Sequence, residues 1–310
     1  MMLKIEGLCK NYGKFQAVKN LNLHIPKGEI FGFVGPNGAG KTTTMKIICG
    51  LLTASSGKAF VDGIDVLNNP RALKSRIGYM PDFFGVYDNL KVMEYLEFYA
   101  SIYNIKGSQR EKVCKDLLEL VDLVEKKDFY VDSLSRGMKQ RLCLARSMVH
   151  NPELLVLDEP ASGMDPRARV EMKEILRTLK TMGKTIIVSS HILPELAELC
   201  TTIGIIEKGS MVVSGTVEEI TQKVYQSQLV RIKVLEKLGD TLRILKEYPN
   251  IEDVHEEGNN TIEAAFKGDE SFLSTLLCRL VSDNIPVVSF NQLYGNLEDI
   301  FMKVTAELEG

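Results

Sequence analysis

A glycine-rich run holds the first residues whose types and spacing suit catalysis. Residues 35–42 read GPNGAGKT, which fits the pattern G-x-x-x-x-G-K-[ST], and they lie between a predicted strand at 29–34 and a predicted helix at 42–52. Glycines let backbone N–H groups wrap closely around phosphates, and the start of a helix adds a favourable dipole. The loop is therefore predicted to bind a nucleoside triphosphate, and a plain glycine-rich turn is the alternative for this motif alone. The predicted binding residues are Gly35, Pro36, Asn37, Gly38, Ala39, Gly40, Lys41, Thr42 and Thr43.

Two residues of this loop have separate predicted roles. Lys41 is expected to reach the β- and γ-phosphates as a catalytic residue. Thr42 is expected to supply a hydroxyl ligand for Mg²⁺, a hard cation that keeps several waters and takes its remaining oxygens from phosphate. The cofactors predicted from the sequence are therefore ATP and Mg²⁺.

Paired carboxylates end a second apolar stretch. Residues 154–159 read LLVLDE, so an apolar strand runs directly into Asp158 and Glu159. Asp158 is expected to hold the metal through water, and Glu159 is expected to orient or deprotonate the water that attacks the γ-phosphate. Two solvated acids at a strand end are the alternative for this pair alone. Together with the loop, the pair predicts nucleotide hydrolysis by in-line phosphoryl transfer.

The elements that must position these residues alternate between strands and helices. Residues 3–24 read as antiparallel strands, and the apolar runs at 154–157 and 185–188 are typical of buried parallel strands. A helix is predicted between those two runs, at 166–183, and a mostly helical insertion at about 83–150. This order predicts an α/β fold with a mixed sheet core, an antiparallel β arm and a helical subdomain.

A change in composition after a capping box at 216–219 places a domain boundary between residues 220 and 221. Residues 221–310 carry 9 Lys and Arg against 15 Asp and Glu, whereas residues 1–220 carry 29 against 26. An acidic tail disfavours nucleic acid as a partner. The order strand, helix, strand, strand, helix, strand between 229 and 290 predicts a small α+β ferredoxin-like domain, followed by a short helix at 297–304.

Composition excludes several other classes of protein. The chain is 45% hydrophobic and 25% charged, as globular proteins are. No apolar run approaches the roughly 18 residues of a membrane-spanning helix, and residues 1–10 lack the apolar core of a signal peptide, so we expect a soluble cytoplasmic protein. The six cysteines form no CxxC pair, which predicts small buried thiols and neither disulfides nor a zinc site.

On these motifs, residues 2–220 resemble the nucleotide-binding subunits of ATP-binding cassette (ABC) transporters. Residues 134–138, LSRGM, are similar to the family's signature sequence, and the resemblance implies that Ser135 and Gly137 contact the γ-phosphate held by a partner subunit. A serine N-cap at a helix start suits an anion. The acidic C-terminal part, with its LEDIF ending at 297–301, resembles the extension of exporter subunits of drug- or antibiotic-resistance type.

The resemblance implies three further contacts. His191 is similar to a switch histidine that touches the γ-phosphate, while the other three histidines are interpreted as surface or satisfied residues. Asp165 lies in a segment similar to the loop that crosses the dimer interface, and it is equally suited to cap the helix that follows. Tyr12 resembles the aromatic residue that stacks on adenine, with Phe15 as an alternative.

The sequence departs from the family pattern at two positions. Asp82 stands where the family usually has glutamine, and it is expected to bind Mg²⁺ or water. Arg136 replaces the first of two signature glycines and is expected to add positive charge near the phosphate. Neither change is expected to inactivate the protein.

The resemblance implies an ATPase subunit that powers a separately encoded membrane permease. ATP would close a dimer between this chain and a second copy of itself or a paralogous ATPase subunit, at the inner face of the cell membrane. An aromatic-rich stretch is expected to dock the permease, although several of its members would instead fill the helical core. The stretch contains Tyr79, Phe83, Phe84, Tyr87, Tyr95, Phe98, Tyr99 and Tyr103.

Two other functions compete with transport. A soluble ABC-type ATPase acting on DNA or ribosomes would carry long coiled coils or two cassettes, and the sequence shows neither heptads nor a second phosphate-binding loop. A nucleotide-dependent regulator with little turnover is the other alternative. The resemblance favours the transport ATPase.

Overall fold

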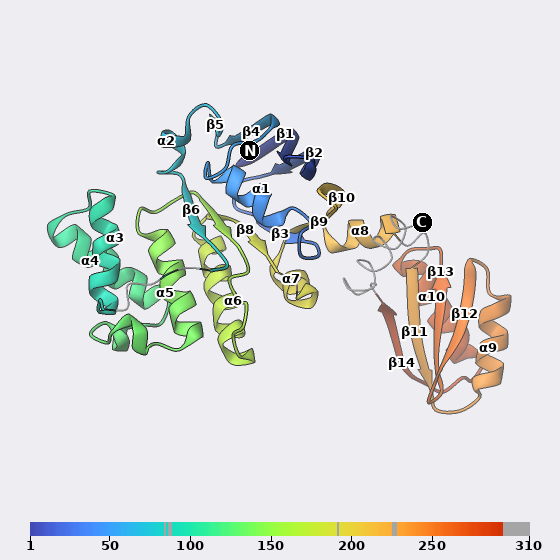
Figure 1. The fold of residues 1–310 in the computed structure, drawn as a ribbon. Coiled ribbons are helices and arrows are strands. Elements are labelled where there is room, and N and C mark those ends of the chain that lie inside the picture. Colours follow the sequence, from blue (N-terminus) through green and yellow to red (C-terminus); the bar gives the residue numbers. More distant parts are fainter. Residues whose placement is uncertain (84, 86–88, 191, 225–227, 294–310) are drawn as a thin grey trace. The chain divides into compact units, whose positions relative to one another are not determined.

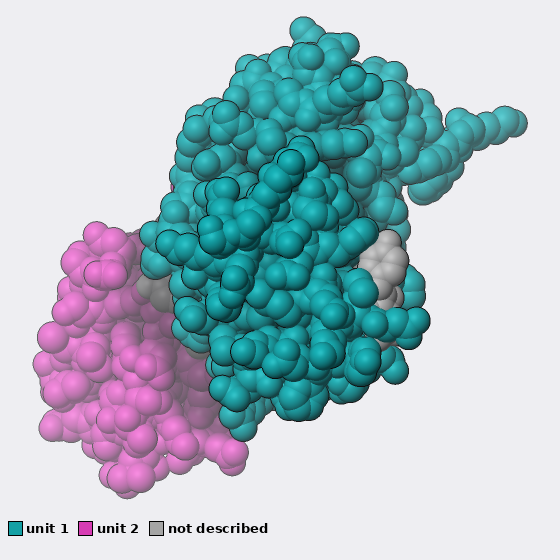
Figure 2. Space-filling view, turned by 90° about the vertical axis from the view of Figure 1, so that its left-hand side faces the viewer, with its two compact units in different colours: residues 1–214 teal, residues 215–310 magenta. Residues whose placement is uncertain are grey.

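The structure, a computed structural model, describes residues 1–83, 85, 89–190, 192–224 and 228–293. It divides into two compact units, residues 1–214 and 215–310, coloured teal and magenta in Figure 2. The division comes just before helix α8 (Val217–Val224). Thr216 and Glu219 form the reciprocal hydrogen bonds of a capping box at the start of this helix.

A six-stranded sheet forms the centre of unit 1. Its order is β10-β9-β3-β8-β7-β6, and the pairs β9–β3, β3–β8, β8–β7 and β7–β6 are parallel. Every residue of β3, β7 and β8 is buried, which explains why these strands read as unbroken apolar runs. The bounds are β3 Ile30–Val34, β6 Ile77–Met80, β7 Leu154–Leu157, β8 Thr185–Ser189, β9 Thr202–Glu207 and β10 Ser210–Gly215.

A four-stranded antiparallel sheet accompanies it, in the order β2-β1-β4-β5. The bounds are β1 Leu3–Tyr12, β2 Phe15–Ile25, β4 Ser56–Val61 and β5 Ile64–Asp65. Leu3 pairs with Ile25 on one side and with Val61 on the other, and all three side chains are buried in the core of unit 1. The predicted fold class, a mixed α/β core with an antiparallel arm, is confirmed.

Three helices gather at one end of unit 1 (Figure 1) and pack on one another: α3 (Val92–Ile102), α4 (Gly107–Leu120) and α5 (Arg136–Met148). Asn104 and Gly107 have φ of +60° and +57°, so the backbone turns between α3 and α4. The other helices of unit 1 are α1 (Lys41–Ile48), α2 (Pro70–Leu73), α6 (Pro166–Thr181) and α7 (Leu193–Leu199), with single 3₁₀ turns at Val124–Lys126 and Val131–Ser133.

Unit 2 has the predicted order strand, helix, strand, strand, helix, strand. Its sheet runs β12-β13-β11-β14, which is the ferredoxin-like order, and all of its neighbouring strands are antiparallel. The elements are β11 Gln228–Val234, α9 Leu238–Glu247, β12 Ile251–Gly258, β13 Thr261–Phe266, α10 Glu270–Ser282 and β14 Val287–Leu293. The helix predicted at 297–304 lies outside the described residues.

Two expectations need comment. The cysteines are all free, but only Cys49, Cys114 and Cys143 are buried, and the prediction is wrong for exposed Cys278. That residue lies on α10, whose other face packs on the core through Leu273, Leu276 and Leu280. In the described part of the chain, no helix is both long enough and apolar enough to cross a membrane.

Candidate nucleotide-binding site

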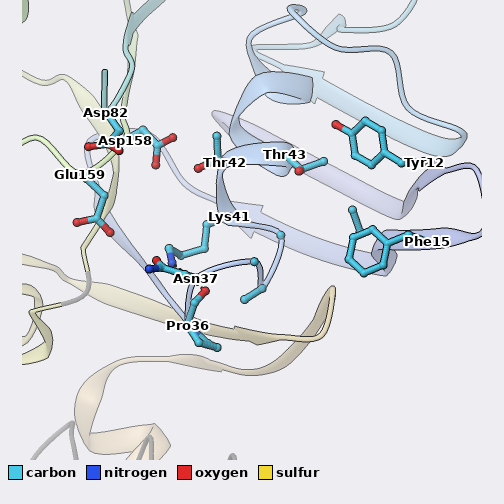
Figure 3. Close-up of a pocket in the computed structure, with 14 residues that line it drawn as sticks. Tyr12, Phe15, Pro36, Asn37, Lys41, Thr42, Thr43, Asp82, Asp158 and Glu159 are labelled. Carbon is cyan, nitrogen blue, oxygen red and sulfur yellow. Dashed lines mark hydrogen bonds between the residues drawn. The ribbon is translucent and has the colours of Figure 1, made fainter. Parts of the chain in front are cut away.

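A pocket of about 270 Å³ contains most of the residues predicted to bind nucleotide (Figure 3). It lies around the loop that joins β3 to α1. The end of β7 supplies Asp158 and Glu159, and Asp82 follows β6. The residues that line it are Tyr12, Phe15, Ala17, Pro36, Asn37, Gly38, Ala39, Gly40, Lys41, Thr42, Thr43, Asp82, Asp158 and Glu159.

Two glycines allow the loop to press against its surroundings. A Cβ atom at Gly35 would lie 2.3 Å from the carbonyl oxygen of Ile206 in β9, and one at Gly40 would lie 2.6 Å from that of Ala17 in β2. Gly40 also has a φ of +109°, which side chains rarely tolerate. The loop therefore keeps its shape because β2 and β9 hold it from outside.

Lys41 begins α1, and its ammonium is bonded to its own loop. Nζ donates to the carbonyl oxygen of Gly35 at 2.6 Å and to that of Pro36 at 3.2 Å. Burial lowers the pKa of Lys41 from its usual range, while the carboxylates of Glu159 and Asp158 act in the opposite direction. The buried cation thus lies in the same pocket as two acids.

One hydroxyl joins the two acidic residues to a neighbouring strand. Asp158 is only 2% exposed, and the Ser189 Oγ at the end of β8 donates to its Oδ1 at 2.7 Å. The same Oγ accepts the backbone N–H of Glu159 at 3.0 Å. Glu159 has a φ of +52°, an uncommon conformation for a residue with a side chain. Ser189 therefore holds both the buried carboxylate and the strained turn.

Two exposed rings occupy the opposite side of the pocket. In Figure 3, Asp82, Asp158 and Glu159 lie on one side of Lys41, and Tyr12 and Phe15 lie on the other. Tyr12 is 50% exposed and Phe15 is 62% exposed, so both offer a free face. Both rings line the pocket.

Gly35 belongs to the loop but does not itself line the pocket, and three further predicted site residues belong to other segments. The Ser135 side chain caps α5 by accepting the Met138 N–H at 3.3 Å, and the Asp165 side chain caps α6 by accepting the Ala168 N–H at 3.0 Å. Ser135 and Asp165 are exposed, and neither they nor Gly137 line the pocket. His191 lies outside the described residues.

Arg136 contacts a loop of its own chain. A Cβ atom at Gly163 would lie 2.3 Å from the Arg136 Cζ, so the guanidinium rests directly on this glycine. One turn further along α5, the Gln140 Nε2 donates to the carbonyl oxygen of Ser162 at 2.9 Å. We call Arg136 and Gln140 the α5 clamp. It ties the start of α5 to the loop between β7 and α6.

The sequence did not single out Ser189, Ala17 or Ile206. Ala17 and Ile206 act through backbone oxygens, which leave no trace in residue type. Ser189 had a weak signal, because it is the first polar residue after the apolar run at 185–188 and so ends a strand beside the paired acids. Parallel strands bring their carboxyl ends to one edge, which is where such residues meet.

The fold and the loop define a P-loop nucleotide hydrolase. Comparison with known sequences identifies its family. Residues 18–162 match the family ABC transporter, and residues 215–305 match the C-terminal domain of ATP-binding proteins like DrrA1-3. Linearmycin resistance ATP-binding protein LnrL of Bacillus subtilis is 32% identical over 305 residues, covering 98% of both chains. The chain belongs to the family of ABC transporter ATP-binding proteins.

Other relatives and solved structures agree with this assignment. The Nod factor export ATP-binding protein I of Ralstonia nicotianae is 31% identical, over 98% of this chain and 94% of that protein. The probable multidrug ABC transporter ATP-binding protein YbhF of Escherichia coli is 39% identical over 71% of this chain, which spans only 38% of that protein. An ATP-binding subunit of an ABC transporter superposes with a TM-score of 0.66 at 27% identity, over 72% of this chain and 93% of that one. The dimeric cassette MJ0796 superposes with a TM-score of 0.63 at 26% identity, over 69% and 98%.

Proposed function

We propose that this chain binds ATP with Mg²⁺, hydrolyses it, and uses closure of an ATP-bound dimer to power a separately encoded permease of an exporter, at the inner face of the membrane. One observation carries the proposal: separate elements bring Lys41, Thr42, Asp158 and Glu159 to one pocket. A loop that only turned the chain would not need a buried Asp158 and a half-buried Glu159 in the same pocket as its lysine.

Each side chain of the pocket has a distinct role in this proposal. Lys41 exchanges its bonds to the loop carbonyls for bonds to the β- and γ-phosphates, where its charge offsets theirs. Glu159 orients the attacking water and accepts its proton. Tyr12 or Phe15 stacks on the base. The backbone N–H groups of residues 37–43 wrap the phosphates. The dipole at the start of α1 also attracts their negative charge.

The donor set fits Mg²⁺ held partly by nucleotide. Thr42, Asp158 and Asp82 line the same pocket and offer hard oxygen ligands. Within the described residues, no group of three or more His, Cys, Asp or Glu is arranged to hold a metal ion alone. Magnesium beside a triphosphate is usually held by one or two carboxylates, because phosphate oxygens and water supply most of its other ligands. Asp158 and Asp82 are enough for such a site. When bound, the ion would offset negative charge on the phosphates.

The second half of each site is proposed to come from another subunit. Ser135 presents the capped start of α5 at the surface, and Gly137 and Asp165 lie outside the pocket of their own chain. A relative of known structure, MJ0796, is described both as a dimer and in a post-hydrolysis state with ADP and Pi. We infer that Ser135, Gly137, Asp165 and, by resemblance, His191 act on nucleotide across such a dimer.

The permease is proposed to dock on the helical end of unit 1. Of the aromatic stretch, Tyr95 is fully buried and belongs to the core, whereas Phe83, Phe98 and Tyr103 are exposed. Phe84 and Tyr87 lie outside the described residues. Phe83 directly follows Asp82 in the segment after β6, and an exposed ring there suits a partner whose position must be linked to nucleotide.

Replacing Lys41 tests the nucleotide site. Lys41→Ala removes the buried cation and should weaken ATP binding by about 10- to 100-fold, because hydrogen bonds to charged groups contribute about 1.5–3 kcal/mol. Isothermal calorimetry with Mg²⁺ and ATP measures this change. Lys46→Ala, at an exposed position of the same helix, should bind ATP as the parent does. Equal affinity for parent and Lys41→Ala would remove the basis of the proposal.

Replacing Glu159 tests turnover and closure. Glu159→Gln keeps the shape of the side chain but cannot accept the proton, so hydrolysis should fall at least about 100-fold while ATP binding persists. The uncleaved ATP should then hold a dimer that size-exclusion chromatography detects. A variant that stays monomeric in saturating ATP and Mg²⁺ contradicts the dimer. A parent chain that binds ATP but shows no turnover, with or without a permease, would favour a regulator.

A further inference from the structure

Tyr12, one of the two rings that line the nucleotide pocket, has a cation over it. The ammonium nitrogen of Lys10 lies 5.2 Å from the centre of the Tyr12 ring, within the roughly 6 Å over which a cation is attracted to an aromatic face. Phe15 also lines the pocket, but in the described part of the chain no lysine or arginine lies over its ring. The two candidate stacking rings therefore differ in what holds them.

Lys10 reaches the ring from outside the pocket. It lies two residues before Tyr12 in β1, a spacing at which side chains can meet on one face of a strand. Tyr12 lines the nucleotide pocket and Lys10 does not. Because Tyr12 is 50% exposed, the contact with Lys10 leaves part of its ring free for a base (Figure 3).

The ammonium of Lys10 is itself held in place. Its Nζ donates to the carbonyl oxygen of Thr53 at 2.7 Å. Thr53 lies in the segment between α1 and β4, and α1 is the helix that begins at Lys41. Lys10 therefore connects the Tyr12 ring to the segment that follows the phosphate-binding loop and its helix.

Two other hydrogen bonds join the same segments without the side chain of Lys10. The Ser55 N–H donates to the carbonyl oxygen of Cys9 at 2.8 Å, and the Asn11 N–H donates to the Ser55 Oγ at 2.9 Å. These bonds should keep the backbone of β1 in place when the Lys10 side chain is changed. A substitution at Lys10 therefore tests the support of the ring.

We propose that Lys10 is a positioning residue for the nucleotide, whose ammonium holds the Tyr12 ring in the orientation that stacks on the base. The inference rests on the proposed function, because it concerns the base-binding part of the same site. A half-exposed tyrosine loses rotational freedom when a base stacks on it, and this loss of entropy weakens binding. A ring that Lys10 already holds loses less, so Lys10 raises the affinity for nucleotide through Tyr12.

Binding of ATP and of tripolyphosphate by the full chain separates the ring from the phosphates. With Mg²⁺ present, Lys10→Gln should bind ATP about two- to five-fold more weakly than the parent, as expected for a cation–π contact at an exposed site. Tripolyphosphate has no base, so both chains should bind it equally. Isothermal calorimetry measures both affinities. If tripolyphosphate binding weakens as much as ATP binding, Lys10 acts on the phosphates by its charge and the inference is overturned.

Further variants place the effect on the ring. Lys10→Arg keeps a cation that can lie over an aromatic face, and it should bind ATP nearly as the parent does. Lys14→Gln removes an exposed lysine from the turn between β1 and β2, and as the matched control it should change nothing. In a Tyr12→Leu background, Lys10→Gln should cause no further loss of ATP affinity.

This comparison needs only ATP, so it decides even where tripolyphosphate binds too weakly to measure. A loss that persists in the Tyr12→Leu background would overturn the inference. A loss that disappears in a Phe15→Leu background instead would assign the support to the wrong ring and would overturn it as well.

Turnover separates the inference from a loss of fold and from the proposed function. Stacking on the base is the same before and during hydrolysis, so Lys10→Gln should raise KM for ATP about two- to five-fold and leave kcat unchanged. If Lys10→Gln does not fold, as circular dichroism would show, Lys10→Met takes its place and keeps the apolar stem. An unchanged KM, or a fall in kcat alone, would overturn the inference while the proposed function stands. A parent chain that neither binds nor hydrolyses ATP would defeat the proposed function.

Discussion

Ser189 shows how a single hydroxyl can hold the turn that carries two acidic residues. It donates to the buried Asp158 carboxylate and accepts the backbone N–H of Glu159. The left-handed conformation at Glu159 is costly by itself, and it persists only where its surroundings hold it. The position of the proposed general base therefore depends on a residue that does not line the nucleotide pocket.

Ser189→Ala should harm both stability and turnover. It removes both hydrogen bonds and leaves a buried carboxylate oxygen without its donor, so the free energy of unfolding should fall by about 1–3 kcal/mol. Turnover should fall more than ATP affinity, because Lys41 and the loop are untouched. Urea unfolding and steady-state ATPase assays measure the two effects. Ser147→Ala, which loses one buried helical hydrogen bond, is the control for stability alone. Unchanged turnover in Ser189→Ala would show that Glu159 holds its own geometry.

At the scale of elements, α5 and the loop after β7 form a linked pair. In the α5 clamp, Gln140 bonds the carbonyl oxygen of Ser162 and Arg136 lies against Gly163. The N–H of Ser162 in turn donates to the carbonyl oxygen of Glu159 at 3.0 Å. A shift of α5, whose start carries Ser135, is therefore passed to the backbone of the proposed general base. Arg136, which departs from the family pattern, takes part in this link within its own chain.

A double-mutant cycle measures the contact between Arg136 and Gly163. Gly163→Ala places a Cβ atom on the guanidinium and should destabilise the parent by about 1–3 kcal/mol. Part of that loss should vanish in an Arg136→Gly background, giving a coupling of at least about 0.5 kcal/mol by chemical denaturation. Gly183 has a similar positive φ, and no atom lies near the position of its Cβ. Gly183→Ala therefore measures the loss of stability that comes from the backbone conformation alone. Strictly additive effects would mean that the guanidinium moves away freely.

At the scale of the whole molecule, the two units have separate cores. The core of unit 2 is built from its own strands and helices, with Val230, Ile232, Ile262, Phe266 and Leu276 among its buried residues. Every residue that lines the nucleotide pocket belongs to unit 1. Unit 1 therefore contains everything one subunit contributes to this pocket in the described chain.

A chain that ends at residue 214 should keep nucleotide binding. Because no residue of unit 2 lines the pocket, the ATP dissociation constant should stay within about three-fold of that of the full chain, which is less than 1 kcal/mol. Calorimetry gives the constant, and circular dichroism of the shortened chain provides the control for folding. A folded fragment that binds ATP more than about ten-fold more weakly than the full chain would show that residues 215–310 influence the nucleotide pocket.

Local pattern alone predicted much of this protein, because some features depend only on consecutive residues. The unbroken apolar runs at β7 and β8 indicated buried parallel strands, and the loop at 35–42 and the acids at 158–159 indicated a nucleotide hydrolase. The C-terminal order of elements predicted the ferredoxin-like sheet. Exposed Cys278 was mispredicted, because residue type does not report which face of α10 a position occupies.

Contacts between distant segments required the tertiary structure. The carbonyl oxygens of Ala17 and Ile206 make Gly40 and Gly35 necessary, the hydroxyl of Ser189 fixes Glu159, and the guanidinium of Arg136 covers Gly163. Local periodicity records whether a residue faces the core but not which partner it meets there. The sequence thus indicated which groups are proposed to perform the chemistry, whereas long-range packing decided which residues hold them in place.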